Sequence, residues 1–223
     1  MIGISRDDRW VTGLLLAGVL FFIVSRFVFS DPVFRGVFAE AGVVETLSFW
    51  GWLAASAVVV LYARPFGLPG FSFAVLCAAF AAREADWQKK FTSDGLTKIN
   101  YYQDASIPLT ERLAAGAVVL VLLAALLYAG FLVVRFFFFR RGWTTRTGIW
   151  MLIAGIFLVV GKIMDRLPAE AEKHFGIEIG EGGLALLLAL EEGMEMFTPF
   201  LFIWSVWLAR SGQSYFSRPQ VAG

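Results

Sequence analysis

Long apolar runs separated by short polar stretches make up nearly the whole chain. A helix needs roughly 17–25 mostly apolar residues to cross the hydrocarbon core of a bilayer, and six segments reach or approach that length. None of them alternates residue by residue over about ten positions, as the strands of a transmembrane β-barrel do. The predicted helices cover residues 10–29, 43–62, 66–86, 113–139, 148–165 and 182–209. The pattern predicts an all-α, polytopic membrane protein: a single six-transmembrane-helix bundle spanning residues 1–223.

The composition agrees with this prediction. Hydrophobic residues make up 58% of the chain and charged residues 17%, and the mean hydropathy is +0.71, so the chain is more apolar than a typical soluble domain. The third segment is the weakest, because it spans a bilayer only if its polar flanks are included. Alanines in the third segment and glycines in the fifth favour close packing, so we expect these two helices to be central and the fourth, rich in Leu and Val, to be peripheral.

The charges between the segments predict the orientation. If the six segments alternate, the side that holds both termini carries only two acidic residues, Asp7 and Asp8. Basic residues divide almost equally between the two sides, so their number alone does not decide the orientation. The terminal side, however, carries a short, acid-free cluster beside two membrane segments: Arg135, Arg140, Arg141 and Arg146. This cluster favours a cytoplasmic location, so we predict cytoplasmic termini and a bacterial inner (plasma) membrane location.

The first segment has one competing interpretation, a cleaved signal peptide ending near Ser30. Asp7 and Asp8 do not fit the positively charged start of a signal peptide, and the apolar run is long for one. Cleavage would leave five spans with the same orientation. The single cysteine, Cys77, excludes an intramolecular disulfide.

Three glutamates, Glu191, Glu192 and Glu195, interrupt the last apolar segment. At helical spacing they project from one side of the helix within about two turns. A charged side chain at the centre of a membrane costs roughly 2.5–3.5 kcal/mol on the insertion scale, so three of them need compensation. The outer ends of other segments place further acids at the same face of the membrane: Glu45, Glu84, Asp86 and Asp165. Crowded carboxylates in a low dielectric cannot all be ionised, so some must be protonated, ion-paired or bound to a cation.

Three functions are compatible with this cluster. The first is cation binding in a carboxylate-rich pocket near the extracytoplasmic face. A divalent metal is the favoured cation, because hard cations prefer oxygen ligands. The second is a structural network in a scaffold or assembly subunit, in which the acids pair with Arg83, Lys162 and Arg166. The third is proton- or cation-coupled transport, although the opposite half of the bundle offers few polar residues to continue a path.

A metal at the lipid–water interface would suit chemistry on a lipid head group. His174, the only histidine, lies within a predicted short helix over residues 168–175 of the outer loop. It is a candidate ligand or acid/base group, with an exposed loop histidine as the alternative. Lys89, Lys90 and Lys98 are candidate contacts for lipid phosphate, although lysines are common at any membrane interface. No motif indicates an organic cofactor or nucleic-acid binding, the expected partners are membrane lipids, and the oligomeric state is left open.

Overall fold

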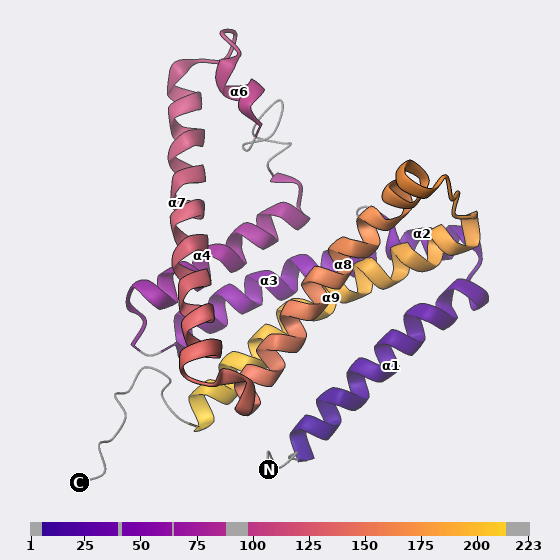
Figure 1. The fold of residues 1–223 in the computed structure, drawn as a ribbon, viewed down its shortest axis with the longest axis horizontal. Helices are drawn as coiled ribbons and strands as arrows, with labels where there is room; N and C mark the ends of the chain where they lie inside the picture. Colours follow the sequence, from indigo (N-terminus) through magenta and orange to yellow (C-terminus); the bar gives the residue numbers. More distant parts are fainter. Residues whose placement is uncertain (1–5, 40–41, 64, 88–97, 213–223) are drawn as a thin grey trace.

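The computed structural model describes residues 6–39, 42–63, 65–87 and 98–212, and within these ranges the secondary structure is helical, with no strand. Figure 1 shows the arrangement of the helices. In chain order the helices are α1 (Arg6–Val28), α2 (Asp31–Phe38), α3 (Val43–Tyr62), α4 (Gly67–Glu84), α6 (Ile99–Gln103), α7 (Leu109–Val134), the π-helical turn η1 (Arg135–Phe139), the 3-10 turn η2 (Gly142–Thr144), α8 (Arg146–Phe175) and α9 (Glu181–Gly212).

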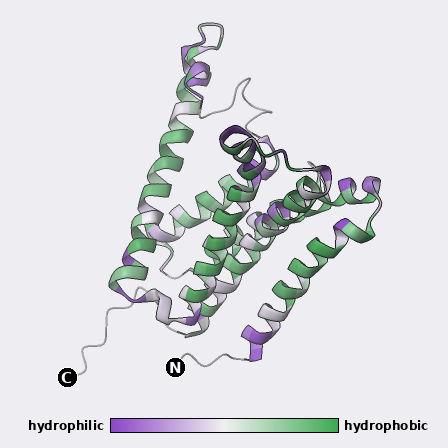
Figure 2. Cartoon of the chain, turned by 45° about the vertical axis from the view of Figure 1, so that its right-hand side comes forward, coloured by the Kyte–Doolittle hydropathy of each residue, from purple (hydrophilic) through white to green (hydrophobic). Residues whose placement is uncertain are grey.

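Four helical stretches of the described chain are long and apolar enough to cross a membrane. They are α1, the region Asp31–Tyr62 that contains α3, the region Leu109–Phe139 that contains α7, and α8. Figure 2 shows that these helices are hydrophobic along most of their length, and many of their large hydrophobic side chains are exposed, which suits a lipid environment. Two of the six predicted spans fall outside this set, because α4 ends in Arg83 and Glu84 and α9 carries three glutamates.

Helix α9 lies at the centre of the bundle, where it packs against α1, α3 and α8. Helices α3 and α4 form a second close pair, and α7 contacts the bundle mainly through α4. The predicted peripheral position of the fourth segment is therefore confirmed. The expectation that the third and fifth segments are the central ones is wrong. The glutamate-bearing α9 makes more extensive contact with the other helices than either α4 or α8 does.

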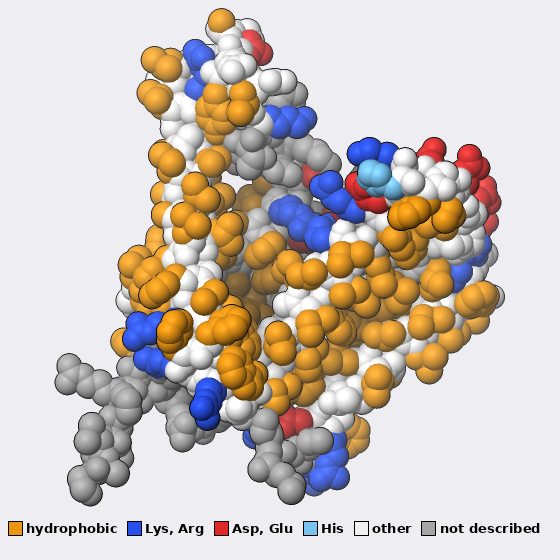
Figure 3. Space-filling view, viewed as in Figure 1, with side chains coloured by type: hydrophobic (Ala, Val, Ile, Leu, Met, Phe, Trp, Pro, Cys, Tyr) orange, Lys and Arg blue, Asp and Glu red, His pale blue; other side chains and the backbone are white. Residues whose placement is uncertain are grey.

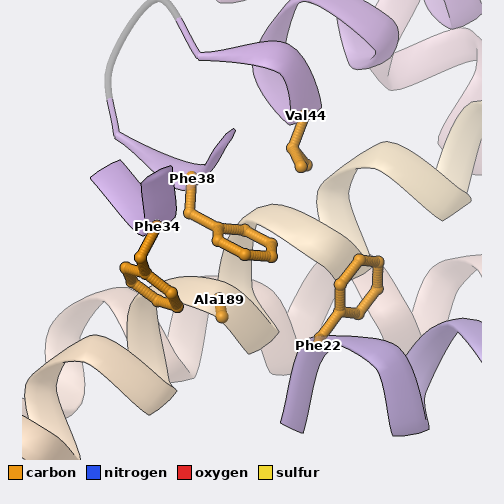
Figure 4. Packing of buried hydrophobic residues seen from close by; sticks show 5 residues of the cluster. All are labelled: Phe22, Phe34, Phe38, Val44 and Ala189. Carbon is orange, nitrogen blue, oxygen red and sulfur yellow. The ribbon is translucent and has the colours of Figure 1, made fainter. Parts of the chain in front are cut away.

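Aromatic side chains fill the core where α1, α2, α3 and α9 meet. The buried cluster joins Phe22, Phe34, Phe38, Val44 and Ala189 (Figure 4). Helix α2, which hydropathy does not predict, contributes two of these phenylalanines. An ideal Cβ at Gly193 would lie 2.2 Å from the Phe22 ring, so the glycine allows α1 to approach α9 closely.

Helix α8 extends farther than the sequence predicts. The predicted separate helix over residues 168–175 is wrong, because the chain continues without a break through Pro168 to Phe175. A proline removes one backbone donor, but its fixed φ is close to the helical value. The predicted stop at Gly176 is confirmed: this residue has φ +63°, a left-handed conformation that glycine adopts without a Cβ penalty.

The two ends of the bundle carry different chemistry. Helix α1 begins and α9 ends at the same end, which also carries the η1–η2 connection (Figure 1). We call it the arginine end, after Arg135, Arg140, Arg146 and Arg210. The opposite end, where α3 begins and α4 ends, carries the glutamate cluster, and we call it the acidic end.

Candidate functional site

At the acidic end, the carboxylate of Glu195 joins three helices. Glu195 projects from α9 with 11% of its side chain exposed. The Nη2 atom of Arg83, at the end of α4, donates to both of its oxygens at 3.0 and 3.2 Å. The Nζ atom of Lys162, on α8, lies 2.7 Å from Oε1 of the same carboxylate. One acid on the central helix thus binds a cation on each of two neighbouring helices.

Lys162 extends this network along α8 and α9. Its Nζ atom lies 3.3 Å from Asp165 Oδ2, one turn along α8, and 3.5 Å from Glu191 Oε1 on α9. An ideal Cβ at Gly161 would be in ordinary van der Waals contact with Glu195 Cγ, at 3.5 Å, so this glycine lies directly beside the glutamate where α8 meets α9. We refer to Arg83, Lys162, Asp165, Glu191 and Glu195 as the paired network.

Other acids lie beside this network on its α3 and α4 side. The carboxylate of Glu192 is repelled by those of Glu45 and Glu84, as well as by its neighbours on α9. Within the described ranges, neither Glu84 nor Glu192 has a Lys or Arg nitrogen within ion-pair distance. The Oγ atom of Ser48, a residue that is 1% exposed, approaches Glu84 but has no partner of hydrogen-bond geometry among the described residues. We refer to Glu45, Glu84, Glu192 and Ser48 as the acid pocket.

Helical spacing explains why three neighbouring glutamates separate into two groups. Glu191 and Glu195 are four residues apart, so they lie one above the other on the face that meets α8. Glu192 is rotated by about 100° from Glu191 at 3.6 residues per turn, which turns it toward α3 and α4. The sequence predicts that the three lie on one side of the helix, but the neighbouring helices divide that side between the two groups.

Two other predicted site residues lie at the edge of the cluster. Asp86 follows the end of α4 with φ +51° and is half-buried. Arg166, predicted as an ion-pair partner, is exposed on α8 and pairs with no residue of the described chain. Arg83 and Lys162 therefore supply the positive charge of the network.

His174 lies away from the cluster, near the end of α8. Its Nε2 atom is 3.0 Å from Glu170 Oε2, one turn earlier on the same helix, and more than half of each side chain is exposed. Twelve residues of helix separate His174 from Lys162, or about 18 Å at 1.5 Å per residue. In this arrangement the histidine binds a surface acid of its own helix and not the clustered carboxylates.

The lysines predicted to contact lipid phosphate are only partly described. Lys89 and Lys90 lie outside the described residues, whereas Lys98 is exposed and directly precedes α6. Nearby, the Tyr101 side chain is buried, and Arg112 on α7 donates to the Tyr102 backbone carbonyl at 3.1 Å. This contact fixes α6 against the start of α7.

The described acids do not form a preformed metal centre of three or more ligands. Nowhere within the described ranges are three or more His, Cys, Asp or Glu side chains placed to hold a metal ion. The clearest difference from the sequence-based hypothesis is therefore the role of Glu191 and Glu195, which engage Lys162 and are not free for a cation.

A second buried ion pair lies at the arginine end, and the sequence reasoning missed it. Asp8, on α1, is 6% exposed, and its carboxylate accepts from Arg146 Nε at 2.8 Å and Nη2 at 3.0 Å. The indole Nε1 of Trp150 donates to the same carboxylate at 2.9 Å. The available signal was that Asp8, with Asp7, is one of only two acids among the basic residues of the predicted cytoplasmic side.

The arginine end also holds a cavity of about 570 Å³. Its walls come from the α3–α4 connection, the last turns of α7, the start of α8 and the end of α9. It lies near Tyr62, whereas Glu45 of the acidic end is 17 residues earlier on α3, about 26 Å away at helical rise. The cavity and the glutamates are therefore separate features.

Comparisons with known proteins identify no relative. No family model matches the chain, and no curated protein or solved structure matches it significantly.

Proposed function

We propose that this chain is an integral membrane scaffold or assembly subunit in which the buried acids of the acidic end hold the helices together. In this proposal all six predicted segments cross the bacterial inner membrane, and both termini are cytoplasmic. The central packing of α9 and the close pairing of α4 with α3 support counting both as spans. At 1.5 Å per residue, the 18 residues of α4 and the 32 of α9 reach about 27 and 48 Å, against a hydrocarbon core of about 30 Å.

The observation that carries the structural role is the sharing of one carboxylate by two cations. Glu195, on α9, binds Arg83 of α4 and Lys162 of α8, so these three helices are held at a fixed relative position. Removing Glu195 leaves both cations without their shared carboxylate, at a cost that water moderates because the Arg83 and Lys162 side chains are 41% and 37% exposed. The network thus specifies the arrangement of the helices, even though apolar packing supplies most of the stability.

A pair of glutamine variants tests this role. Glu195→Gln leaves two cations without their shared carboxylate, so we expect it to lower the free energy of unfolding in detergent by about 1–3 kcal/mol. Glu192→Gln is the matched control, with the same chemistry on the same helix, and we expect it to be neutral or stabilising because it removes a repelled carboxylate. A larger loss of thermal stability for Glu192→Gln than for Glu195→Gln would overturn the proposal.

A second candidate function, cation binding, is favoured by the acid pocket. Glu84 and Glu192 lie among other carboxylates without a Lys or Arg partner in the described chain, and the buried Ser48 hydroxyl beside them lacks a hydrogen-bond partner. A bound cation would offset the repulsion and accept the hydroxyl oxygen as a ligand, with carboxylate and hydroxyl oxygens suiting a hard divalent ion. Chemistry on a lipid head group would be the next question only if such an ion binds.

Elemental analysis of protein purified without chelator tests the second candidate. A stoichiometric divalent metal that is lost in the Glu84→Gln/Glu192→Gln variant and retained in Glu191→Gln would establish the acid pocket as the site. Cation binding would be ruled out if the wild-type protein is metal-free and if added Ca²⁺, Mg²⁺, Mn²⁺ or Zn²⁺ does not stabilise it. The structural proposal is judged separately, by the stability of the Glu195→Gln variant.

A further inference from the structure

The cavity at the arginine end combines an apolar interior with positive charge. Most of its lining is aliphatic and aromatic, including Leu132, Met151, Phe202 and Val206. Its volume of about 570 Å³ is within the range of small-molecule and lipid sites, roughly 300–1,000 Å³. Because α7 contacts the bundle mainly through α4, the space between α7 and the α8–α9 pair is left for this cavity.

Among the described residues, three arginines line the same cavity and no acidic residue does. Arg135 and Arg140 come from the end of α7 and the turn that follows it, and Arg210 comes from the last turns of α9. Basic side chains gather around the lower end of α7, below the hydrophobic side chains that face α8 (Figure 3). The cavity is therefore apolar within the bundle and cationic at its end, a distribution that complements an amphipathic anion.

The local structure holds these arginines at the cavity. The Arg210 guanidinium lies 4.4 Å from the centre of the Tyr62 ring and 5.7 Å from the centre of the Trp207 ring, so both aromatic rings hold it by cation–π contacts. Arg135 begins the π-helical turn η1, a departure from α-helical geometry of the kind often found at functional sites. The nearby Arg146 binds Asp8 and does not line the cavity.

We propose that this cavity binds an anionic phospholipid, with an acyl chain in the apolar interior and the phosphate held by Arg135, Arg140 and Arg210. The position supports a lipid, because the cavity opens beside the lipid-facing helix α7 at the end of the bundle where head groups lie. Charge complementarity selects an anionic head group. Arginine binds phosphate with two parallel hydrogen bonds, and none of the described residues that line the cavity supplies a competing carboxylate. The lipid would join peripheral α7 to the rest of the bundle.

Thermal unfolding of the full-length protein in detergent tests the proposal, with phosphatidylglycerol and phosphatidylcholine as probes. We expect phosphatidylglycerol to raise the midpoint of unfolding at concentrations where phosphatidylcholine does not, because the two lipids differ in head-group charge. In the Arg135→Gln/Arg210→Gln variant the apparent affinity should fall at least tenfold. The matched control Arg6→Gln/Arg9→Gln removes the same charge from exposed positions at the same end and should bind as the wild type does.

A second pair of variants tests the acyl site without changing charge. Val206→Trp fills the cavity and should abolish the phosphatidylglycerol-dependent shift, whereas Leu126→Trp, on the exposed surface of α7 and away from the cavity, should retain it. Equal stabilisation by phosphatidylcholine, or an equal shift with water-soluble glycerol phosphate, would overturn the proposal. So would an unchanged affinity in both the arginine and the Val206→Trp variants.

Discussion

Arg146 binds the carboxylate of Asp8 through two parallel hydrogen bonds, although the two residues are separated by 138 positions in the chain. The pair connects the start of α1 to the start of α8 at the arginine end. Since only 6% of Asp8 is exposed, this contact replaces the water that would otherwise solvate the charge. Helix α1, whose outward side chains face lipid, is thereby fixed to the bundle near its first turn.

This ion pair predicts that substitutions of two adjacent aspartates, Asp8 and Asp7, change the free energy of unfolding by very different amounts. Asp8→Asn should lower the free energy of unfolding by about 1–3 kcal/mol, because it leaves the Arg146 guanidinium without its carboxylate. Asp7→Asn, at an exposed position one residue earlier, should change it by less than about 0.5 kcal/mol. Thermal unfolding in detergent measures both variants. Equal effects would mean that the Asp8–Arg146 contact does not stabilise the protein.

Close packing of α1 on α9 gives a second prediction. A methyl group at Gly193 would lie 2.2 Å from a Phe22 ring carbon, and that ring is buried among other aromatics, so Gly193→Ala should destabilise by about 1–3 kcal/mol. Gly182→Ala is the matched control, since it has open space on the same helix and should be neutral or slightly stabilising. Adding Phe22→Leu to Gly193→Ala should recover part of the loss. A neutral Gly193→Ala would contradict the described contact.

The proposed topology predicts opposite accessibility for two exposed loop positions, one at each end of α8. In intact cells a membrane-impermeant maleimide should label Glu178→Cys, on the predicted outer side, and should label Thr144→Cys only after permeabilisation. The native Cys77 is 3% exposed and provides an unreactive background. Labelling of both variants in intact cells would contradict the crossing of α8, and the reverse pattern would place the termini outside.

The helices themselves are largely predictable from the sequence, because hydropathy depends on local composition. The predicted segment 43–62 matches α3, and the stop at Gly176 follows from a residue that favours positive φ. Helix α2 was missed because eight residues are too few for a hydropathy signal. The length of α8 was missed because Pro168 was interpreted as a boundary, whereas the proline lies inside the helix.

The candidate site could be predicted only in part, for a physical reason. The spacing of Glu191, Glu192 and Glu195 places them on one side of a helix, and counting charges identifies Arg83 and Lys162 as partners. The division of the glutamates between two groups depends on how α9 is rotated against α3, α4 and α8, which sequence spacing does not specify. The Asp8–Arg146 pair was missed for the same reason, because it depends on the packing of helices distant in the chain.

The most direct test of the structural role is a double-mutant cycle on Arg83 and Glu195. Free energies of unfolding would be measured for the wild type, Arg83→Gln, Glu195→Gln and the double variant, with Arg83→Gln/Glu181→Gln as a control pair because Glu181 is exposed at the start of α9. The ion pair predicts that the double variant loses less than the sum of the single variants, by about 1 kcal/mol or more, while the control pair is additive. Additivity of Arg83→Gln and Glu195→Gln to within about 0.3–0.5 kcal/mol would contradict the central claim.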